Sequence, residues 1–250
     1  MRYVLAMAYR EYRIRLSNPV LPLWDVLVPV IYLLIFGASF ERWIGQGLGG
    51  LDYVTFFLGG VLGMVTFGIA MNSSYAFFED LQSGMFHELM TYPFARRDLL
   101  IGKLLFNALF SVVGAALCTL AGVALLGVEV RLGALPLLLL WTLLGTAGWY
   151  FLFSWLSLRL RGFNAYHTTT SAAYMLLMFV SNLFYPAERL PRVVQGLAWL
   201  NPITWQVDLM RNAIYGAGEA DVLRLEALGF AAFVTISFWL ANRALNGPIE

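Results

Sequence analysis

Side chains that could do chemistry are few in this sequence. The two histidines, His87 and His167, lie far apart along the chain, and Cys118 is the single cysteine. Metal catalysis needs several His, Cys or carboxylate ligands that converge, and a serine nucleophile needs a Gly-x-Ser-x-Gly turn, which is missing. We therefore expect no catalytic residue and no metal site. His167, beside three threonines, is interpreted as a hydrogen-bonded packing residue.

The sequence also lacks the loop that cradles the phosphates of ATP. No Gly-x-x-x-x-Gly-Lys-Ser/Thr motif occurs. Any ATP-driven role would require ATP and Mg²⁺ on a separate partner chain. The formal net charge is only +1, and no basic stripe is present to neutralise phosphates, so a nucleic-acid partner is excluded.

Three charged residues are candidates for a structural or gating role. Asp25 lies inside an apolar run, where a carboxylate at a helix centre costs about 2.5 to 3.5 kcal/mol on insertion scales. It falls near one end of that run, so we expect it to pair with Arg13 or Arg15 in a structural role. Asp208 and Arg211 are spaced to pair at i,i+3 on one helix. We expect this pair to be exposed on the outer side. Its position there is the reason for the hypothesis that it has a gating role.

The elements that carry these residues are apolar helices. The chain is 60% apolar and 12% charged, about half the charge of a soluble domain. A bilayer-spanning helix needs about 20 mostly apolar residues. Four runs without any charged residue supply this length, and two weaker runs each contain one acidic residue. The predicted fold is therefore all-α and polytopic, with six transmembrane helices over about 21–40, 53–78, 104–128, 132–158, 162–187 and 225–245.

The placement of arginine and lysine predicts the orientation, because these residues favour cytoplasmic loops. With the N-terminus inside, ten basic residues are cytoplasmic and six are outside, and both termini are cytoplasmic in a plasma (inner) membrane. The inner set is Arg2, Arg10, Arg13, Arg15, Arg96, Arg97, Lys103, Arg159, Arg161 and Arg243; the outer set is Arg42, Arg131, Arg189, Arg192, Arg211 and Arg224.

Residues 1–18 form a predicted interfacial helix on the inner leaflet. Apolar residues recur at helical spacing, arginines lie largely on the other side, and Tyr3, Tyr9 and Tyr12 suit the headgroup layer.

Two short helices are predicted on the outer side, before the last span. Apolar stretches over 193–200 and 203–215 are separated by Asn201-Pro202, where proline cannot continue a helix. Both are too short to cross a bilayer. We expect them to form a re-entrant hairpin that dips into the outer interface.

A charged, amphipathic helix is predicted over 79–92, between the second and third spans. Leu81, Met85, Phe86 and Leu89 fall on one half of the helical wheel, and polar residues including Glu88 fall on the other. Its loop is cytoplasmic in the predicted topology. A helix that simply lies on the membrane surface explains the same pattern without any partner.

The whole arrangement resembles the membrane subunits of ABC exporters of the type-2 permease class. The resemblance covers almost the whole chain. It is carried by MTYPFARRDLLIGK at 90–103, and by NLFYPAERLPRVVQGLAWLNPITWQVDLMRNAIYG at 182–216, in which Pro186, Pro191, Asn201, Pro202 and Arg211 occur in the family's order. The Glu-Ala-Ala-x-x-x-Gly loop of importer permeases is missing, which disfavours an importer.

The resemblance implies roles for two segments. Segment 79–92 is similar to the coupling helix, which sits in a groove of a cytoplasmic ABC ATPase subunit. The implied contact residues are Glu79, Asp80, Glu88, Arg96 and Arg97 as polar contacts, with Met85, Phe86 and Leu89 as the apolar face. Segment 187–215 is similar to the outer gate helices, with Pro186, Pro191, Asn201, Pro202, Asp208 and Arg211 as gate residues.

The function implied is that of a single permease domain, 1–250, that moves an amphipathic or lipid-like substrate out of the cytoplasm. Drugs, lipids and lipid-linked glycans all fit a large apolar pathway. The expected partners are the ATPase subunit, a second copy or a related permease, and membrane lipids. An ion-coupled secondary transporter and a non-catalytic membrane assembly subunit stay open as alternatives, and a membrane-embedded enzyme is disfavoured by the missing catalytic motifs.

Overall fold

A computed structural model describes residues 2–44, 52–93, 95–131, 133, 135–187 and 190–247. Several positions used in the sequence predictions lie outside these ranges: Met1, Phe94, Leu132, Ala134, Glu188, Arg189 and residues 248–250.

The described residues fold into helices and loops without a strand, which confirms the all-α prediction. The helices are α1 (Arg2–Ser17), α2 (Val20–Tyr32), the π-helix η1 (Leu33–Gly37), α3 (Ala38–Ile44), α4 (Tyr53–Gln82), α5 (Met85–Leu89), α6 (Arg96–Leu126), α7 (Leu135–Ser157), α8 (Phe163–Phe179), α9 (Arg192–Trp199), α10 (Pro202–Tyr215) and α11 (Ala220–Asn246).

Five helical segments in the described ranges are long and apolar enough to cross a membrane. They are Pro22–Glu41, which joins α2, η1 and α3, and the helices α4, α6, α7 and α11. Helix α8 covers most of the predicted fifth span but has only 17 residues, about 26 Å at 1.5 Å per residue. The hydrocarbon core is about 30 Å thick, so the count of six spans stays a prediction.

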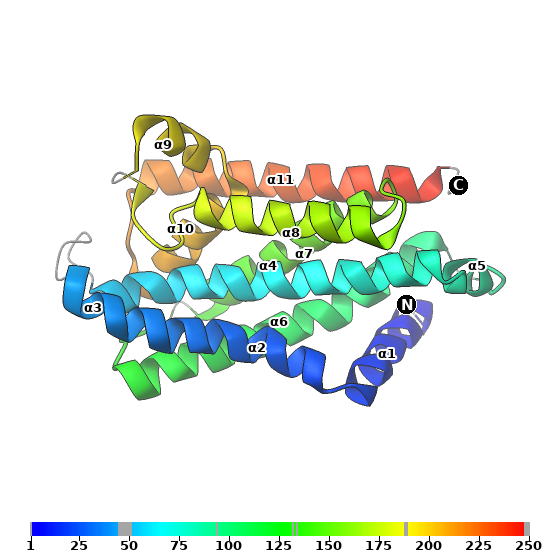
Figure 1. Cartoon of the computed structure of the whole chain (residues 1–250), viewed down its shortest axis with the longest axis horizontal. Helices are drawn as coiled ribbons and strands as arrows, with labels where there is room; N and C mark the ends of the chain where they lie inside the picture. Colours follow the sequence, from blue (N-terminus) through cyan, green and yellow to red (C-terminus); the bar gives the residue numbers. More distant parts are fainter. Residues whose placement is uncertain are drawn as a thin grey trace.

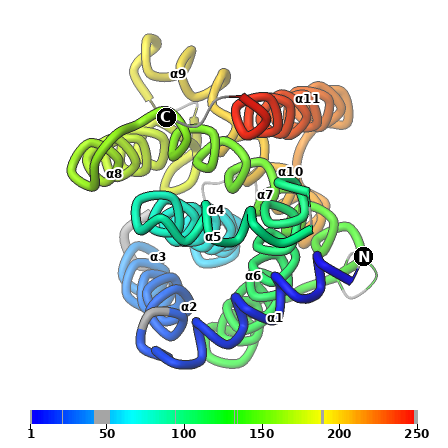
Figure 2. Tube along the Cα trace, turned by 90° about the vertical axis from the view of Figure 1, so that its right-hand side faces the viewer, coloured from blue at the N-terminus to red at the C-terminus, as the bar shows by residue number. Residues whose placement is uncertain are grey.

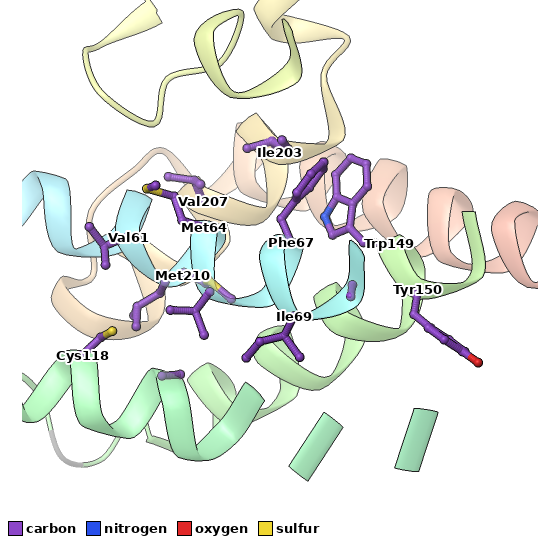
Figure 3. Close-up of a cluster of buried hydrophobic side chains, with 14 of the residues drawn as sticks. Val61, Met64, Phe67, Ile69, Cys118, Trp149, Tyr150, Ile203, Val207 and Met210 are labelled. Atoms are coloured by element: carbon purple, nitrogen blue, oxygen red, sulfur yellow. The ribbon is translucent and has the colours of Figure 1, made fainter. Parts of the chain in front are cut away.

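Helix α4 forms the centre of the bundle. In the apolar stretch of α4, 89% of the residues are buried. In the apolar stretches of Pro22–Glu41 and α11, only 17% are buried. Figures 1 and 2 show α4 surrounded by α2, α6, α7 and α8. A helix that is apolar on all sides is typical of such a central position. Figure 3 shows Val61, Met64 and Phe67 of α4 packed among side chains of α7 and α10, including Trp149 and Val207.

The bundle has two distinct ends. Both chain termini, α1 and α5 lie at one end, which we call the α5 end (Figure 1). Helices α3, α9 and α10 lie at the other, which we call the α9 end. This arrangement follows the alternation of the predicted loops, while the side that faces the cytoplasm stays a prediction.

The structure differs from the predicted continuous helix over 79–92. Helix α4 extends to Gln82, the chain turns at Ser83 and Gly84, and α5 is a separate helix of five residues. Gly84 has φ of +79°, a left-handed conformation that glycine adopts without the steric cost of a Cβ atom. Gly84 therefore sets the change of direction between α4 and α5.

Candidate functional site

Helix α5 is an exposed projection anchored by two apolar side chains. Phe86 is 1% exposed and meets the ring of Phe77 edge-on at 6.2 Å between centroids. Leu89 is also buried, whereas Met85 and Glu88 are exposed. The anchors fix the orientation of α5, and the remaining side chains form an accessible surface at the α5 end.

The predicted partner-contact residues therefore separate into two groups. Phe86 and Leu89 pack inside this chain, so Met85 is the exposed apolar residue of the three. Among the polar residues, Glu79, Glu88 and Arg97 are exposed. Asp80 and Arg96 instead make internal contacts: Arg96 donates hydrogen bonds to the backbone oxygens of Leu245 and Gly247, 2.8 and 3.2 Å away.

Asp80 belongs to a buried ion cluster formed by Arg10, Glu11, Asp80 and Lys103. Nζ of Lys103 lies 2.6 Å from Oε1 of Glu11 and 2.8 Å from Oδ2 of Asp80. The guanidinium of Arg10 donates two hydrogen bonds to the Asp80 carboxylate, at 2.8 and 3.0 Å. The ion cluster thus joins α1, the end of α4 and the start of α6.

The ion cluster is formally neutral and largely buried. It contains two cations and two anions, and Lys103 and Glu11 are 1% and 2% exposed. Buried charges are tolerated when each has an opposite partner. Burial alone would lower the pKa of the Arg10 guanidinium, but the hydrogen bonds and charge of Asp80, together with Glu11, raise that pKa above its ordinary value.

A close helix contact brings these charges together. A Cβ atom on Gly102 would lie 2.4 Å from Cβ of Met7 and 2.8 Å from the backbone oxygen of Val4. Gly102 therefore allows α1 to pack directly on α6, beside Lys103. Sequence reasoning treated Lys103 only as a cytoplasmic charge and missed this pairing; the available signal was a lone lysine followed directly by a long apolar run.

At the α9 end, Arg211 of α10 is buried at 4% exposure. Its guanidinium donates to backbone oxygens of Phe56 at 3.1 Å and Asn182 at 2.8 Å, and to Oδ1 of Asp208 at 3.0 Å. It also lies 3.6 Å from the centroid of the Phe56 ring. The predicted pair with Asp208 is confirmed, but it is not an exposed pair, because Arg211 joins α10 to α4 and to the loop after α8.

The asparagine and prolines predicted as gate residues define the two short helices. Asn201 caps α10 by accepting from the backbone N–H of Ile203, and Pro202 occupies the first turn. The Asn201 amide also donates to the backbone oxygens of Leu177 and Val180 at the end of α8, 2.7 and 2.9 Å away. Pro191 directly precedes α9, and Pro186 lies half-buried in the loop between α8 and α9.

Gln206 of α10 connects three helices in the core. Its amide donates to Oγ1 of Thr66 in α4 at 2.6 Å and accepts from Nε1 of Trp149 in α7 at 2.8 Å. A Cβ atom on Gly145 of α7 would lie 2.0 Å from the Gln206 amide nitrogen. The missing side chain at Gly145 thus provides the space for this polar bridge.

Two other candidates from the sequence have different outcomes. Asp25 pairs with Arg15 at 3.2 Å and accepts a short hydrogen bond from Asn72, so the expected structural pairing is confirmed. His167 was interpreted as a packing residue, but it is exposed on α8, and its Nδ1 lies 3.4 Å from Oγ of Ser171. The threonines beside it lie in the same helix, so they provide no pocket for the ring.

Comparison with known proteins gives a consistent result. A family model described as ABC-2 type transporter matches residues 2–215. The chain is 27% identical over 221 residues to a daunorubicin resistance ABC transporter permease protein of Streptomyces coeruleorubidus, covering 86% of this chain and 74% of that protein. It is 27% identical over 224 residues to nodulation protein J of Rhizobium leguminosarum bv. trifolii, covering 87% and 82%. It is 24% identical over 207 residues to a putative transport permease of Cyanophora paradoxa, covering 78% and 68%.

Proposed function

Because the chain belongs to the ABC-2 type transporter family, we propose that it is the membrane-spanning half of an exporter driven by a separate ATPase subunit. The family and the long apolar helices make it a multi-pass membrane protein with a transport role. ATP and Mg²⁺ would bind to the partner, since this sequence has no P-loop.

The observation that carries the proposal is the construction of α5. It is an exposed projection, it is anchored by Phe86 and Leu89, and the helix that leads into it is held by Asp80 in the buried ion cluster. Because α5 is anchored in this way, a displacement of α5 by a bound partner would also displace the end of α4. The partner contact we propose consists of Glu79, Met85, His87, Glu88 and Arg97.

A path for this movement runs along α4. Displacement of α5 would move Asp80 and hence the Arg10 and Lys103 side chains of α1 and α6. In the middle of α4, Oγ1 of Thr66 accepts a hydrogen bond from Gln206, and near the far end the Phe56 carbonyl accepts one from Arg211. Helix α4 therefore couples α5 to α10, which we propose as part of the outer gate together with α9. The α5 end is the cytoplasmic end in this proposal.

The substrate we propose is amphipathic or lipid-like and leaves the cytoplasm across the plasma membrane. Relatives carry names that refer to daunorubicin resistance and to nodulation. One copy supplies few spans, and two-fold pairing is the commonest closed assembly. We therefore expect two permease copies, or this chain and a related permease, with two ATPase subunits, in contact with membrane lipids.

Co-expression with candidate ATPase subunits tests the proposal. We expect a stable complex that, in proteoliposomes, hydrolyses ATP and moves an amphipathic probe such as a rhodamine dye to the outer side. The control is the same complex with the P-loop lysine of the ATPase replaced, which should bind but not transport. Transport that follows a proton gradient and ignores ATP would support a secondary transporter instead.

A further inference from the structure

A cavity of about 380 Å³ lies at the α9 end, away from α5. Side chains from α9, α10, α11 and the loop after α8 line it; Figure 1 shows these elements together at that end. Its size falls in the range of small-molecule sites. Trp199, Val222 and Leu223 give it an apolar wall, while Asp208, Arg211 and Glu226 give it a charged one.

The charged wall has an excess of acid. Asp208, Glu219 and Glu226 all line the cavity. Arg211 is the one basic side chain in this lining. Its guanidinium also donates hydrogen bonds to the backbone oxygens of Phe56 and Asn182. The lining therefore contains three acidic side chains and one basic side chain.

Glu226 has unused hydrogen-bonding capacity. It is only 5% exposed, and its Oε2 atom is buried without a hydrogen-bond partner. An unpartnered buried carboxylate oxygen is costly. Asp208 and Glu226 are both negatively charged when ionised, and like charges in one cavity repel each other. A donor that carries a positive charge would satisfy both groups.

We propose that this cavity binds the protonated amine of an amphipathic organic cation, with Glu226 accepting a hydrogen bond from its N–H group. The Trp199 ring and the side chains of Val222 and Leu223 would contact the carbon skeleton, and a tryptophan face also attracts an ammonium group. A proton bound to either carboxyl group in the empty cavity would leave to solvent when the ammonium binds.

An amine fits this cavity better than a metal ion. Calcium takes six to eight oxygen ligands, and no group of three potential metal ligands occurs among the residues that the structure describes. A metal ion would gain nothing from the apolar wall, whereas the carbon skeleton of an amphiphile would contact Trp199, Val222 and Leu223. The inference deepens the proposed export of an amphipathic substrate and takes its biological meaning from that proposal.

Calorimetric titration of the full chain in nonionic detergent tests the binding. The probe is octylammonium, and 1-octanol and octanoate are matched compounds that enter micelles but lack the cation. We expect saturable binding of octylammonium alone, with proton release visible as a dependence on buffer ionisation heat. Equal binding of the three compounds would overturn the proposal.

Variants locate the site. Glu226→Gln should weaken octylammonium binding at least tenfold, and Val222→Trp, which fills the cavity and keeps both carboxyl groups, should do the same. Asp221→Asn is the control, because Asp221 lies on the same helix but is 92% exposed in a surface pair with Arg224. Wild-type affinity in Val222→Trp, or in a folded Glu226→Gln protein, would contradict the site.

Binding measurements in nanodiscs distinguish two sources of the amine, a lipid headgroup and a free amphipathic amine. If phosphatidylethanolamine lowers the octylammonium affinity relative to phosphatidylcholine, the natural occupant is a lipid headgroup; if it does not, the occupant is a free amphipathic amine. Both results require the cation site. Binding needs no ATPase, so intact binding without ATP-dependent export would reject the proposed function and leave this site standing.

Discussion

Lys103 of α6 and Glu11 of α1 form a buried ion pair, with Nζ 2.6 Å from Oε1. The same nitrogen reaches Asp80 of α4 at 2.8 Å. One lysine thus holds the N-terminal helix, the central helix and the helix after α5 in a fixed arrangement. Removal of one member of such a pair leaves an uncompensated charge away from water.

Lys103→Met should therefore lower the stability of the protein strongly. Glu11 and Asp80 would be left with Arg10 alone, and loss of one partner from a buried pair typically costs about 3 to 5 kcal/mol. The measurement is the melting temperature in detergent. Arg224→Met is the matched control, because the Arg224 and Asp221 side chains are 77% and 92% exposed; it should leave the melting temperature unchanged. Similar losses in both variants would refute the assignment.

Gly102→Ala should separate α1 from α6. The new Cβ would meet Cβ of Met7 at 2.4 Å and a backbone oxygen at 2.8 Å, and overpacking of this kind costs about 1 to 3 kcal/mol. Gly68→Ala in α4 is the comparison, since nothing lies within 4 Å of its Cβ. We expect Gly68→Ala to be neutral or stabilising. Equal melting temperatures for the two variants would count against the close helix contact.

Arg211→Lys should destabilise the α9 end although it keeps the positive charge. A lysine cannot reproduce the planar set of donors that reaches Phe56, Asn182 and Asp208, and we expect a loss of about 1 to 3 kcal/mol. Hydrogen exchange over α10 measures the effect locally.

In the reconstituted exporter, the Asp208→Ala, Arg211→Ala double variant should reduce transport; unchanged export would remove the gating hypothesis.

Glu88→Lys should uncouple the ATPase without harming the fold. Glu88 is exposed on α5 and makes no contact with the ion cluster among the interactions described above, so the melting temperature should stay the same. Stimulation of ATP hydrolysis by the permease should fall severalfold, because the charge at the partner contact reverses. Asp221→Lys, an exposed reversal at the other end, should leave stimulation intact. Normal stimulation with Glu88→Lys would argue against this contact.

Local rules predicted the helices better than they predicted the contacts between them. The break at Asn201-Pro202 follows from the chemistry of proline and of a helix cap, and α9 and α10 lie within one residue of their predicted starts and ends. The pairs Asp25–Arg15 and Asp208–Arg211 were also accessible, because each joins residues close in sequence. The turn at Gly84 was missed, since the apolar pattern continues across it.

The ion cluster and the cavity could not be derived from the sequence. Glu11 and Lys103 are 92 positions apart, and helical periodicity places a residue on a face without saying which helix that face meets. Gln206 and Glu226 are likewise buried polar residues whose partners lie on other helices. Their partners, Thr66, Trp149 and Asp208, are defined only by the packing of α4, α7 and α11 around α10.

The central claim is that α5 projects into the cytoplasm and docks on an ATPase. A Glu88→Cys variant in a Cys118→Ala background tests it, because Cys118 is the single native cysteine and is buried. We predict that a membrane-impermeant maleimide labels position 88 in inside-out vesicles and not in right-side-out vesicles, and that co-expressed ATPase protects it. Labelling from the external side of the cell, or equal labelling with and without the ATPase, would contradict the account.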